Sequence, residues 1–578
     1  MIVAASLLLT PGITGCAASL KLAQLVVADN DRELRARPKT SPPNSPSHPP
    51  ILFLAIDGVD RALLYDLLRK GELPKLASLL GGAQPNFPHA YFDDTLLSTM
   101  PSSTMAAWTT VITGVGPGEH GITGNEFFIR EERRLGAPAP VSFNDSNPTL
   151  AIYSDDYLDS LLTVPTLYEK MREREPNILI WVAIHQLYRG ADRLLFAKST
   201  ILAQAFEEGL IKLGDAVSGK PDRPDRGLYE KLDKDVIAKV ESDLDGKSPV
   251  PDVLTVYLSG TDLYAHVAEE GPVEARRAYL REVVDPALGG LMDKLREKHG
   301  LEGRWVVLTS DHGHTPVLHD EKHALWTEGD DSPPGLMKKA GYRVRPFEMD
   351  VNATDDFNAV LAEGGATAFV YLADRSVCEA AKTVCDWKRP PRYQEDVLPM
   401  AQAFFLNNQD GSLAPRLRGT LDMILTRRPK PYEERDLPFE VYMGDGRTVP
   451  VGEYLAQHPH PTYIDLEARL RDLAVGQRGE RAGDILLLAH NGDREQVEDR
   501  YYFAGLYRSW HGSPSRQDSE VPFIVANPRL STAQIQQRVS ELLGPSPRQQ
   551  KVSDVLLDLR SGDAPPLSPV RAGHAPGI

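Results

Sequence analysis

Cysteine, basic charge and long apolar runs are all scarce in this sequence. Of its 578 residues only 3 are Cys, and Lys plus Arg number 64 against 81 Asp plus Glu, which leaves a net charge of −17. Such an acidic chain lacks the basic field that neutralises nucleic-acid phosphates, so no nucleic-acid partner is expected. With 25% charged and 41% hydrophobic residues, the composition is otherwise that of a globular protein with one large or several smaller domains.

Only the N-terminus carries a pronounced apolar run, and this run is too short to span a bilayer as a mature helix. It covers Ile2 to Leu9 and is followed by Ile13-Thr14-Gly15-Cys16, which resembles the lipobox of bacterial lipoproteins, although no Lys or Arg precedes it. Residues 1–15 are therefore predicted to be a signal peptide and Cys16 a lipidated membrane anchor. Residues 16–50 are predicted to be a tether, because their second half is rich in Pro and Ser. A buried apolar strand is the alternative for the leader.

The two remaining cysteines, Cys378 and Cys385, are expected to form a disulfide. An exported, membrane-anchored lipoprotein on the periplasmic face of a bacterial membrane meets oxidising conditions, which favour disulfides. A separation of seven residues along one straight helix is too long for a bridge, so a turn must lie between them. Two free, buried thiols are the alternative. No protein partner is predicted.

Strand-like apolar runs recur along the chain with helical stretches between them, and no internal repeat is evident. The runs are Ile51–Ile56, Ile178–Ile184, Val253–Leu258, Val306–Thr309, Ile485–Ala489 and Pro522–Ala526. This alternation predicts an α/β fold, with a mostly parallel sheet flanked by helices on both faces. Residues 51–330 are predicted to form the core, and residues 481–578 to complete it and end in a helix and a Pro-rich tail. The irregular residues 331–480 are predicted to be an inserted cap, with room for one core strand at Ala368–Leu372.

Acidic and imidazole side chains follow three of these strands. They come directly or within a few residues after the runs that end at Ile56, Leu258 and Thr309. Because ligands of open α/β sheets bind outside the carboxyl ends of the strands, these side chains are expected to converge. With one histidine from a loop before the last strand, the candidate ligands are Asp57, Asp262, His266, Asp311, His312 and His511. Mixed nitrogen and oxygen donors suit Zn²⁺, with Mn²⁺ or Fe as alternatives, and six donors predict two ions.

A hydroxyl nucleophile is expected in the segment MPSSTMAAWTTVITGVGPGEHGITGN. Pro101-Ser102-Ser103 is typical of a helix start and Gly114 of a helix end, which places Thr104 in the first helical turn. Free backbone N–H groups and the helix dipole favour an anion there, which assists both an alkoxide and an incoming phosphate. Ser103 is the rival nucleophile, and a purely structural helix cap is the alternative for the whole Ser-Ser-Thr run.

Together these pieces resemble the alkaline phosphatase superfamily, in its type I phosphodiesterase/nucleotide pyrophosphatase branch. The resemblance rests on the order of the motifs: AIDG, a Thr helix ending in TGxxPGxHGI, then DxxxH, SDHG and HGS. It implies two zinc sites. Asp262, His266 and His511 would hold one ion, and Asp57, Asp311 and His312 would hold the second ion. It also implies that Thr104, beside the second ion, is a covalent nucleophile. Asn125 and the backbone N–H of Met105 would then bind the phosphate oxygens.

The resemblance implies a two-zinc hydrolase that cleaves phosphate diesters through a phospho-threonine intermediate. Met-Ala-Ala-Trp after Thr104 differs from the Phe-Pro-Asn-His of animal nucleotide pyrophosphatases, so the leaving group stays open. The same type of site also serves C–P bond hydrolases and phosphoethanolamine transferases. A surface-anchored binding lipoprotein with structural metals is the alternative from another class.

Diesters are expected to be preferred to monoesters, because residues 104–118 contain no Lys or Arg and Asn125 is neutral. The predicted cap contains a group of cations that could reach the phosphate, namely Arg427, Arg428 and Lys430. Other polar side chains are predicted to support the ligands or their loops, namely His314, His120 and Asp60. His185, His458 and His460 are expected to be ordinary core or surface residues. Trp108 is expected in the core, with an apolar wall beside the leaving group as the alternative.

Overall fold

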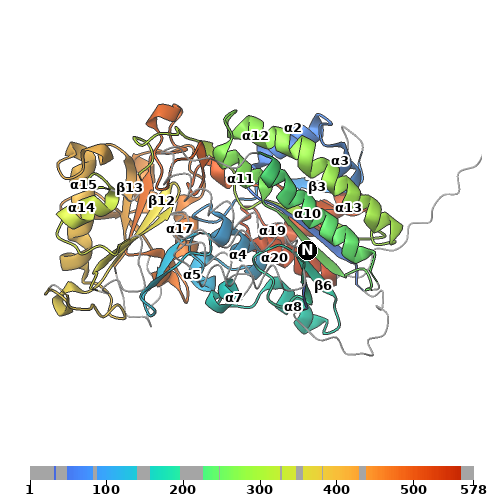
Figure 1. Ribbon diagram of the computed structural model, residues 1–578, viewed down its shortest axis with the longest axis horizontal. Coiled ribbons are helices and arrows are strands. Elements are labelled where there is room, and N and C mark those ends of the chain that lie inside the picture. Colours follow the sequence, from blue (N-terminus) through green and yellow to red (C-terminus); the bar gives the residue numbers. More distant parts are fainter. Residues whose placement is uncertain are drawn as a thin grey trace, which may run out of the picture.

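Two β-sheets divide the chain into two units that lie side by side (Figure 1). The first unit, on an eight-stranded sheet, lies to the right in Figure 1, and the second unit, on a six-stranded sheet, lies to the left. The computed structural model describes residues 31–33, 48–82, 87–139, 156–195, 226–246, 248–325, 329–346, 356–380, 382–428 and 438–561. The predicted signal peptide, Cys16 and most of the predicted tether lie outside these residues. In the parts described, no helix is both long and apolar enough to cross a membrane.

The first unit is built on a mostly parallel sheet with the strand order β1-β7-β6-β8-β2-β9-β18-β3. Its strands are β1 (Asp31–Glu33), β2 (Ile51–Ile56), β3 (Ala90–Asp93), β6 (Ile180–Ala183), β7 (Arg193–Leu195), β8 (Val253–Leu258), β9 (Trp305–Thr309) and β18 (Phe523–Ala526). The five strands from β7 to β9 are parallel to one another, and β1 and β18 run antiparallel to their neighbours. β8, β2 and β9 are buried along their whole length, as expected for parallel strands that are covered on both faces.

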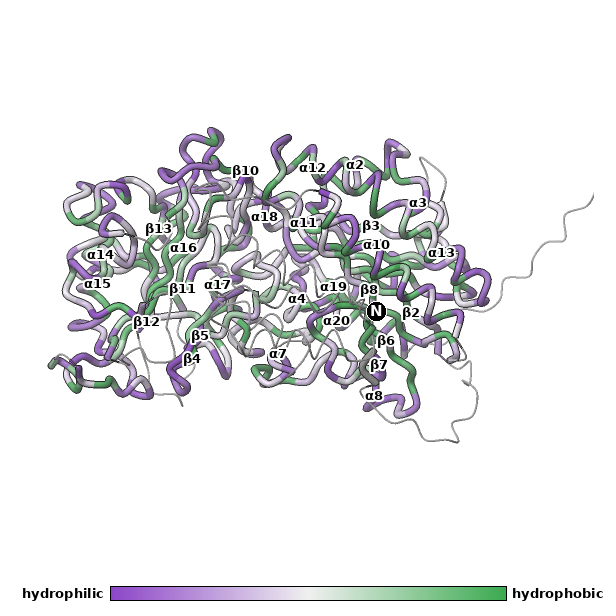
Figure 2. The backbone as a smooth tube through the Cα atoms, in the orientation of Figure 1, coloured by the Kyte–Doolittle hydropathy of each residue, from purple (hydrophilic) through white to green (hydrophobic). Residues whose placement is uncertain are grey.

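Helices cover both faces of this sheet (Figure 1). One layer contains α2 (Arg61–Arg69), α3 (Pro74–Leu79), α10 (Arg226–Leu244), α11 (Gly260–Val267), α12 (Pro272–Tyr279) and α13 (Asp285–Glu297). The other contains α4 (Thr104–Thr113), α8 (Leu167–Arg174), α19 (Thr532–Leu543) and α20 (Gln550–Ser561). Figure 2 shows hydrophobic residues along the strands and hydrophilic residues on the outer turns of the helices. The predicted α/β class, with helices on both faces of a mostly parallel sheet, is confirmed.

The second unit is built on an antiparallel sheet with the order β11-β12-β16-β13-β14-β15. Its strands are β11 (Ala359–Gly364), β12 (Thr367–Leu372), β13 (Leu421–Thr426), β14 (Glu440–Tyr442), β15 (Thr448–Pro450) and β16 (Ile485–Ala489). Side chains alternate between its faces, so Leu361 enters one apolar cluster and Val360 the other. The first cluster lies under α14 (Pro333–Lys339) and α15 (Leu398–Asp410), and the second under α16 (Val451–Gln457) and α17 (Leu466–Ala474).

Three predicted strands have a place in the sheets that differs from the expected one. Ile485–Ala489, expected in the parallel sheet, is β16 of the second sheet and pairs with β12 and β13. Ala368–Leu372, expected as a core strand within the cap, belongs to β12 of that same sheet. The run from Pro522 forms β18 in the first sheet, but antiparallel to β9. Both sheets are covered on both faces, so their strands are equally apolar and the sequence pattern does not distinguish them.

A disulfide joins Cys378 and Cys385, as predicted, with Cα atoms 5.0 Å apart. A short 3-10 turn, Arg375–Val377, ends at Cys378, so the two cysteines are not on one straight helix. Both side chains are buried with Trp387 in the apolar cluster beneath α16 and α17. The alternative of two free thiols is therefore wrong.

Candidate metal centre

The candidate ligands gather at the carboxyl ends of β8, β2 and β9, which are neighbours in the sheet. The register pairs the last residue of β2, Ile56, with the last residue of β8, Leu258, and ends β9 at nearly the same level. Asp57 directly follows β2, and α11 carries Asp262 and His266 one turn apart. Parallel pairing of adjacent strands is thus what brings ligands from distant parts of the chain together.

Asp57, Asp311 and His312 form one group, whose ligand atoms lie within 4.8 Å of one another. Nε2 of His312 lies 3.6 Å from Oδ1 of Asp57 and 3.2 Å from Oδ2 of Asp311. All three residues are buried. The hydroxyl of Thr104 lies 3.2 Å from the same Nε2 atom. The predicted nucleophile is therefore adjacent to the three residues that the family resemblance assigned to one ion.

Asp262 belongs to two overlapping groups, one with His266 and His314 and one with His312 and His511. Nε2 of His266 lies 3.5 Å from Oδ2 of Asp262, and Nε2 of His511 lies 3.9 Å from Oδ1. Nε2 of His314 is nearer, at 2.8 Å from Oδ1 of Asp262. The structure thus brings all six predicted ligands into one cluster. It also places His314, predicted only to support the ligands, within reach of an ion held by Asp262.

The imidazole rings of the predicted ligands are oriented by backbone carbonyls. Nδ1 of His266, His312 and His511 lies 2.8, 2.9 and 3.0 Å from a carbonyl oxygen. These carbonyls belong to Ser509, Gly313 and Ser102, respectively. A carbonyl only accepts hydrogen bonds, so each Nδ1 carries the proton and each Nε2 presents a lone pair. Such an arrangement is typical of metal-binding histidines, whose tautomer is fixed by the partner of the other nitrogen.

Three carboxylate oxygens in the centre are buried and accept no hydrogen bond from any residue that the structure describes: Oδ1 of Asp57, Oδ1 of Asp262 and Oδ2 of Asp311. The other oxygen of Asp57 accepts from the hydroxyl of Tyr257 and from Nε1 of Trp108, the latter at 3.3 Å. Burial, and then repulsion from the two other carboxylates, raises the pKa of Asp57 well above its usual range. Unpartnered anionic oxygens beside imidazole lone pairs are costly unless a cation neutralises them. The centre therefore fits divalent metal ions that accept nitrogen and oxygen ligands.

The helix that carries the predicted nucleophile begins at the metal centre. Thr104 is the first residue of α4, as predicted, and Gly114 ends the helix in the left-handed conformation with φ 73°. Thr104 is 8% exposed, whereas Ser103 is 1% exposed and its Oγ has no hydrogen-bond partner in the described parts of the chain. The free N–H groups of the first turn of α4 make this end of the helix favourable for an anion.

Asn125 contacts the first turn of α4 through its side chain. The backbone N–H of Met105 donates to Oδ1 of Asn125 at 2.9 Å. This bond occupies the Met105 N–H, which the sequence assigned to the phosphate, and fixes the orientation of the Asn125 amide. Nδ2 of Asn125 is then the amide group available as a donor.

Two residues predicted to support the ligands have structural partners of their own. Asp60 caps α2 by accepting from the N–H of Leu63 at 2.9 Å, and it pairs with Arg276 at 2.8 Å. His120 is buried with Nε2 3.1 Å from Oγ1 of Thr110. Their contacts hold loops and helices around the centre.

The other histidines and the predicted cap cations are engaged elsewhere. His185 is buried with its ring 5.3 Å from that of Trp108, whereas His458 stacks on Tyr454. Arg427 is buried and donates to the carbonyl of Gly483 at 2.6 Å. Arg428 lies over the ring of Tyr393 at 4.8 Å, and Lys430 is outside the described residues.

A second polar cluster lies on the second unit and contains Asp422, His490 and Asp493. Nε2 of His460 lies 2.9 Å from Oδ1 of Asp422. The guanidinium of Arg494 lies 3.1 Å from Oδ2 of Asp493 and 3.1 Å from Nδ1 of His490. This guanidinium neutralises the carboxylate of Asp493.

Two residues that touch the metal centre escaped the sequence analysis. Tyr257 donates to Asp57, because the parallel register sets it beside Ala55. Gln549, which directly precedes α20, donates through Nε2 to the carbonyl of Asp311 at 2.8 Å. The apolar alternation of β8 gave no sign of the first contact. The second depends on the packing of a distant segment.

Acidic and imidazole ligands at the ends of three adjacent strands, beside a threonine that begins a helix, define a member of the alkaline phosphatase superfamily. The model of the type I phosphodiesterase/nucleotide pyrophosphatase family matches residues 51–375, which is more than half of the chain, and the chain belongs to this family. It is thus an enzyme of the phosphodiesterase/pyrophosphatase class, as predicted. Among solved structures, murine ectonucleotide pyrophosphatase/phosphodiesterase 5 is similar over 90% of this chain and 97% of its own, with 13% sequence identity and a TM-score of 0.45.

Proposed function

We propose that the chain hydrolyses phosphate diesters with two zinc ions and with Thr104 as a covalent nucleophile. The observation that supports this most directly is the position of Thr104. Its hydroxyl lies 3.2 Å from Nε2 of His312, at the start of a helix and at the edge of the buried cluster of carboxylates and imidazoles. A hydroxyl in this place has both an anion-stabilising helix end and neighbouring metal ligands.

The residues of the cluster suit two ions rather than one. In the proposal, one ion is held by Asp57, Asp311 and His312, and the other by Asp262, His266 and His511. The mixed donor set favours zinc, with Mn²⁺ or Fe as the metals that would also fit. When bound, the ions supply positive charge that activates the nucleophile and stabilises the attacking and leaving oxygens.

The chain's own residues then position the reaction. Oγ1 of Thr104 attacks phosphorus and loses its proton, while the bond to the alcohol on the opposite side breaks and the alcohol takes up a proton. A water molecule next attacks the phospho-threonine, which releases the phosphate monoester and restores the hydroxyl. Nδ2 of Asn125, oriented by Met105, donates to a non-bridging phosphate oxygen. Alignment and charge stabilisation supply most of the catalysis in such transfers.

We also propose that the enzyme is exported and anchored to a membrane through lipidated Cys16. The lipobox-like Ile13-Thr14-Gly15-Cys16 and the Pro- and Ser-rich segment after it support this location. The disulfide between Cys378 and Cys385 is consistent with an oxidising compartment.

A substrate panel tests the proposed function. The full-length protein and a form that begins at His48 are assayed with dinucleotides, nucleotide pyrophosphates, glycerophosphodiesters and phosphonates. The shorter form keeps residues 48–50, because Arg560 donates to the carbonyls of His48 and Pro49 at 3.0 and 2.9 Å. Zinc-dependent release of a monoester from any diester supports the proposal. C–P cleavage alone would identify a C–P bond hydrolase instead, and transfer to an alcohol acceptor alone would identify a transferase. Binding without turnover would identify a binding lipoprotein.

A further inference from the structure

A buried guanidinium of the second unit reaches the loop that precedes the nucleophile. Arg469 lies on α17 and its side chain is fully buried. Its Nη2 donates to the carbonyl of Thr99 at 2.9 Å and to Oγ of Ser102 at 2.8 Å. Its Nη1 donates to the carbonyls of Pro514 at 3.1 Å and Ile464 at 3.3 Å. One side chain thus holds the loop before Thr104 and the loop after His511 together.

Ser102 connects this guanidinium to the metal centre. Its carbonyl accepts from Nδ1 of His511 at 3.0 Å and so sets the ring orientation of a proposed metal ligand. Its side chain lies 3.1 Å from the carbonyl of Ser513. Ser102 also comes two residues before Thr104, so its position determines where α4 begins. A shift of Ser102 would move both the nucleophile and the His511 ring.

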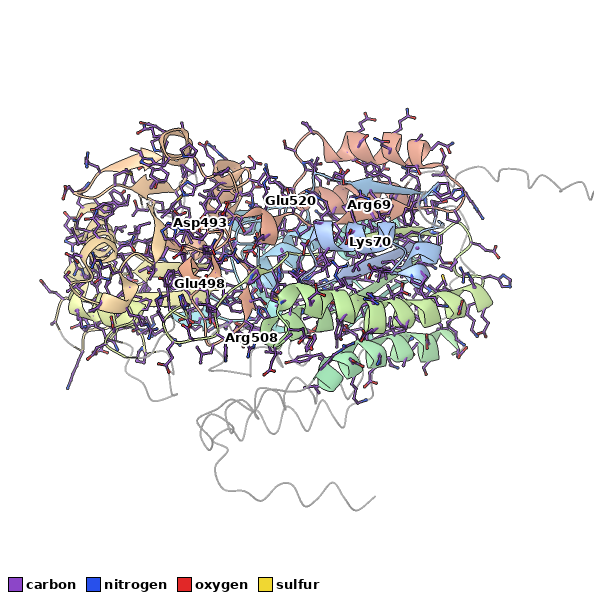
Figure 3. All side chains as sticks on the ribbon, turned by 90° about the horizontal axis from the view of Figure 1, so that it is seen from above. Arg69, Lys70, Asp493, Glu498, Arg508 and Glu520 are labelled. Carbon is purple, nitrogen blue, oxygen red and sulfur yellow. A yellow bond between two sulfur atoms is a disulfide. The ribbon has the colours of Figure 1, made fainter. Side chains whose placement is uncertain are left out.

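The loop that carries His511 lies where the two units meet. Figure 3 shows Arg508 and Glu520, which flank this loop in the sequence, between the two units. From the second unit, α17 packs Leu466 and Leu470 into the apolar cluster against the antiparallel sheet. Arg469 extends from the same helix toward the first unit.

Burying a cation is expensive, so the placement of Arg469 calls for an explanation. Among the described residues, Arg469 donates to three carbonyls and one hydroxyl, and none of these hydrogen-bond acceptors is a carboxylate. A purely stabilising role is better met by apolar side chains of similar volume, because desolvation offsets much of what a buried charge gains. The directional hydrogen bonds of the planar guanidinium, in contrast, fix several loops at defined positions.

We propose that Arg469 is a positioning residue, through which the second unit sets the geometry of Thr104 and His511. This inference rests on the proposed function and adds a role for the second unit, which supplies none of the six proposed metal ligands. Loss of Arg469 is expected to lower kcat rather than raise KM. The variant keeps the groups that bind the substrate, whereas its nucleophile is displaced. A displacement of about 1 Å can cost about 100-fold in rate.

The test compares Arg469→Met and Arg469→Lys with a matched control, Arg427→Met. Arg427 is also a buried arginine of the second unit that donates to a carbonyl, Gly483, but it does not touch the nucleophile loop. Arg469→Met should lower kcat by about 100-fold with KM little changed, and Arg469→Lys should recover part of kcat. A further variant, Arg469→Ala, tests whether the missing group can be supplied from solution. Free guanidinium should restore its turnover, whereas NaCl at equal ionic strength should not.

A second readout does not depend on turnover. Because Ser102 orients His511, Arg469→Met should release its metal to a chelator faster than wild type and Arg427→Met. Wild-type kcat and wild-type metal release in Arg469→Met would overturn the inference. An equal loss of kcat in both Met variants, without rescue by Lys or guanidinium, would also overturn it, since it would reflect stability alone. If wild type turned over no diester, the proposed function would fail, and the release rates would still decide the role of Arg469.

Discussion

Oδ1 of Asn125 accepts a hydrogen bond from the backbone N–H of Met105 at 2.9 Å. This bond joins the proposed phosphate-binding amide to the first turn of the helix that carries the nucleophile. Met105 follows Thr104 directly, so the amide and the hydroxyl are held in a fixed relation. A phosphate placed against Nδ2 of Asn125 would then lie beside the Thr104 hydroxyl without a conformational change. Preorganisation of this kind is the main contribution a protein makes to phosphoryl transfer.

Thr104→Ala should abolish turnover and leave folding and metal content nearly unchanged. The variant loses the hydroxyl and the γ-methyl group of Thr104, and helix α4 can start as before, because its N-cap residue, Ser103, is unchanged. Thr104→Ser should keep partial activity, and Ser103→Ala should be mild. Steady-state kinetics and a trap for a phosphorylated residue by mass spectrometry check these results. An inactive Ser103→Ala beside an active Thr104→Ala would assign the nucleophile to Ser103.

Purified protein should contain close to two zinc equivalents, and chelation should remove activity that added Zn²⁺ restores. Asp311→Asn and His511→Ala should each lower the metal content, because a neutral amide binds a divalent ion more weakly than a carboxylate does and Ala offers no ligand atom. Elemental analysis of the variants measures this directly, and His120→Gln is a control, since His120 contacts Thr110. Full activity of a metal-free protein would contradict the whole centre.

A buried carboxyl away from the ligands predicts a pH dependence of stability. Asp233 of α10 accepts from the N–H of Ser259 at 3.1 Å, and burial raises its pKa to about 7. Tyr279 donates its single hydroxyl proton to the carbonyl of Tyr229 at 2.7 Å, so the Asp233 oxygen 3.1 Å from that hydroxyl should carry a proton. A folded pKa above the unfolded value means that stability is fully present below about pH 4 and is lost as the pH rises to about 7.

Asp233→Asn should therefore raise the unfolding temperature at pH 8 and change it little at pH 4.5. The amide replaces the protonated carboxyl as donor to Tyr279 and accepts from Ser259 as before. The gain in unfolding free energy at pH 8 is at most about 4 kcal/mol, from about three pKa units. Calorimetry of metal-depleted wild type and variant at both pH values provides the comparison. A lower unfolding temperature of the variant at pH 8 would show that the carboxylate is ionised in the folded protein.

The clustering of the candidate ligands could be predicted from the sequence, because these side chains follow their strands at short distances along the chain. Asp57, for example, comes directly after an apolar run, and the rule that ligands bind at the carboxyl ends of parallel strands then brings it near Asp311. The position of Thr104 followed in the same way from local helix-start and helix-end signals.

Contacts that depend on long-range packing could not be predicted. The donation from Tyr257 to Asp57 requires the register between β8 and β2, and a period-two pattern does not set it when both faces are buried. The reach of Arg469 into the nucleophile loop depends on how the second unit docks on the first. The place of β16 in the antiparallel sheet was missed because a buried apolar run fits either sheet.

Cys16→Ser should move the protein from the membrane fraction into the soluble fraction. The lipobox-like sequence and the Pro- and Ser-rich segment after it are the basis for this prediction, since Cys16 lies outside the described residues. Fractionation of cells that express wild type and variant, followed by mass spectrometry of the N-terminal peptide, is the measurement. Wild-type protein found soluble and unlipidated would show that the leader is not a lipoprotein signal.

The remaining prediction is that diesters are preferred to monoesters. Near neutral pH a monoester carries nearly two negative charges and a diester one, so monoesterases need additional cationic donors for the extra non-bridging oxygen. Residues 104–118 contain no Lys or Arg, and the proposed phosphate donor, Asn125, is neutral. Of the cations expected from the predicted cap, Arg427 is buried against the Gly483 carbonyl and Arg428 lies over Tyr393.

A neutral amide leaves room for a second esterified oxygen, which a diester has and a monoester lacks. The measurement is kcat/KM for bis-p-nitrophenyl phosphate against p-nitrophenyl phosphate, at one pH and one zinc concentration. A diester advantage is expected. The variant Asn125→Ala should lower kcat/KM for both substrates, because it removes the donor to the phosphate oxygen that they share. A monoester advantage of about tenfold, or ~1.4 kcal/mol of transition-state discrimination, would instead identify the enzyme as a phosphatase and would require a cation at the phosphate that this geometry does not supply.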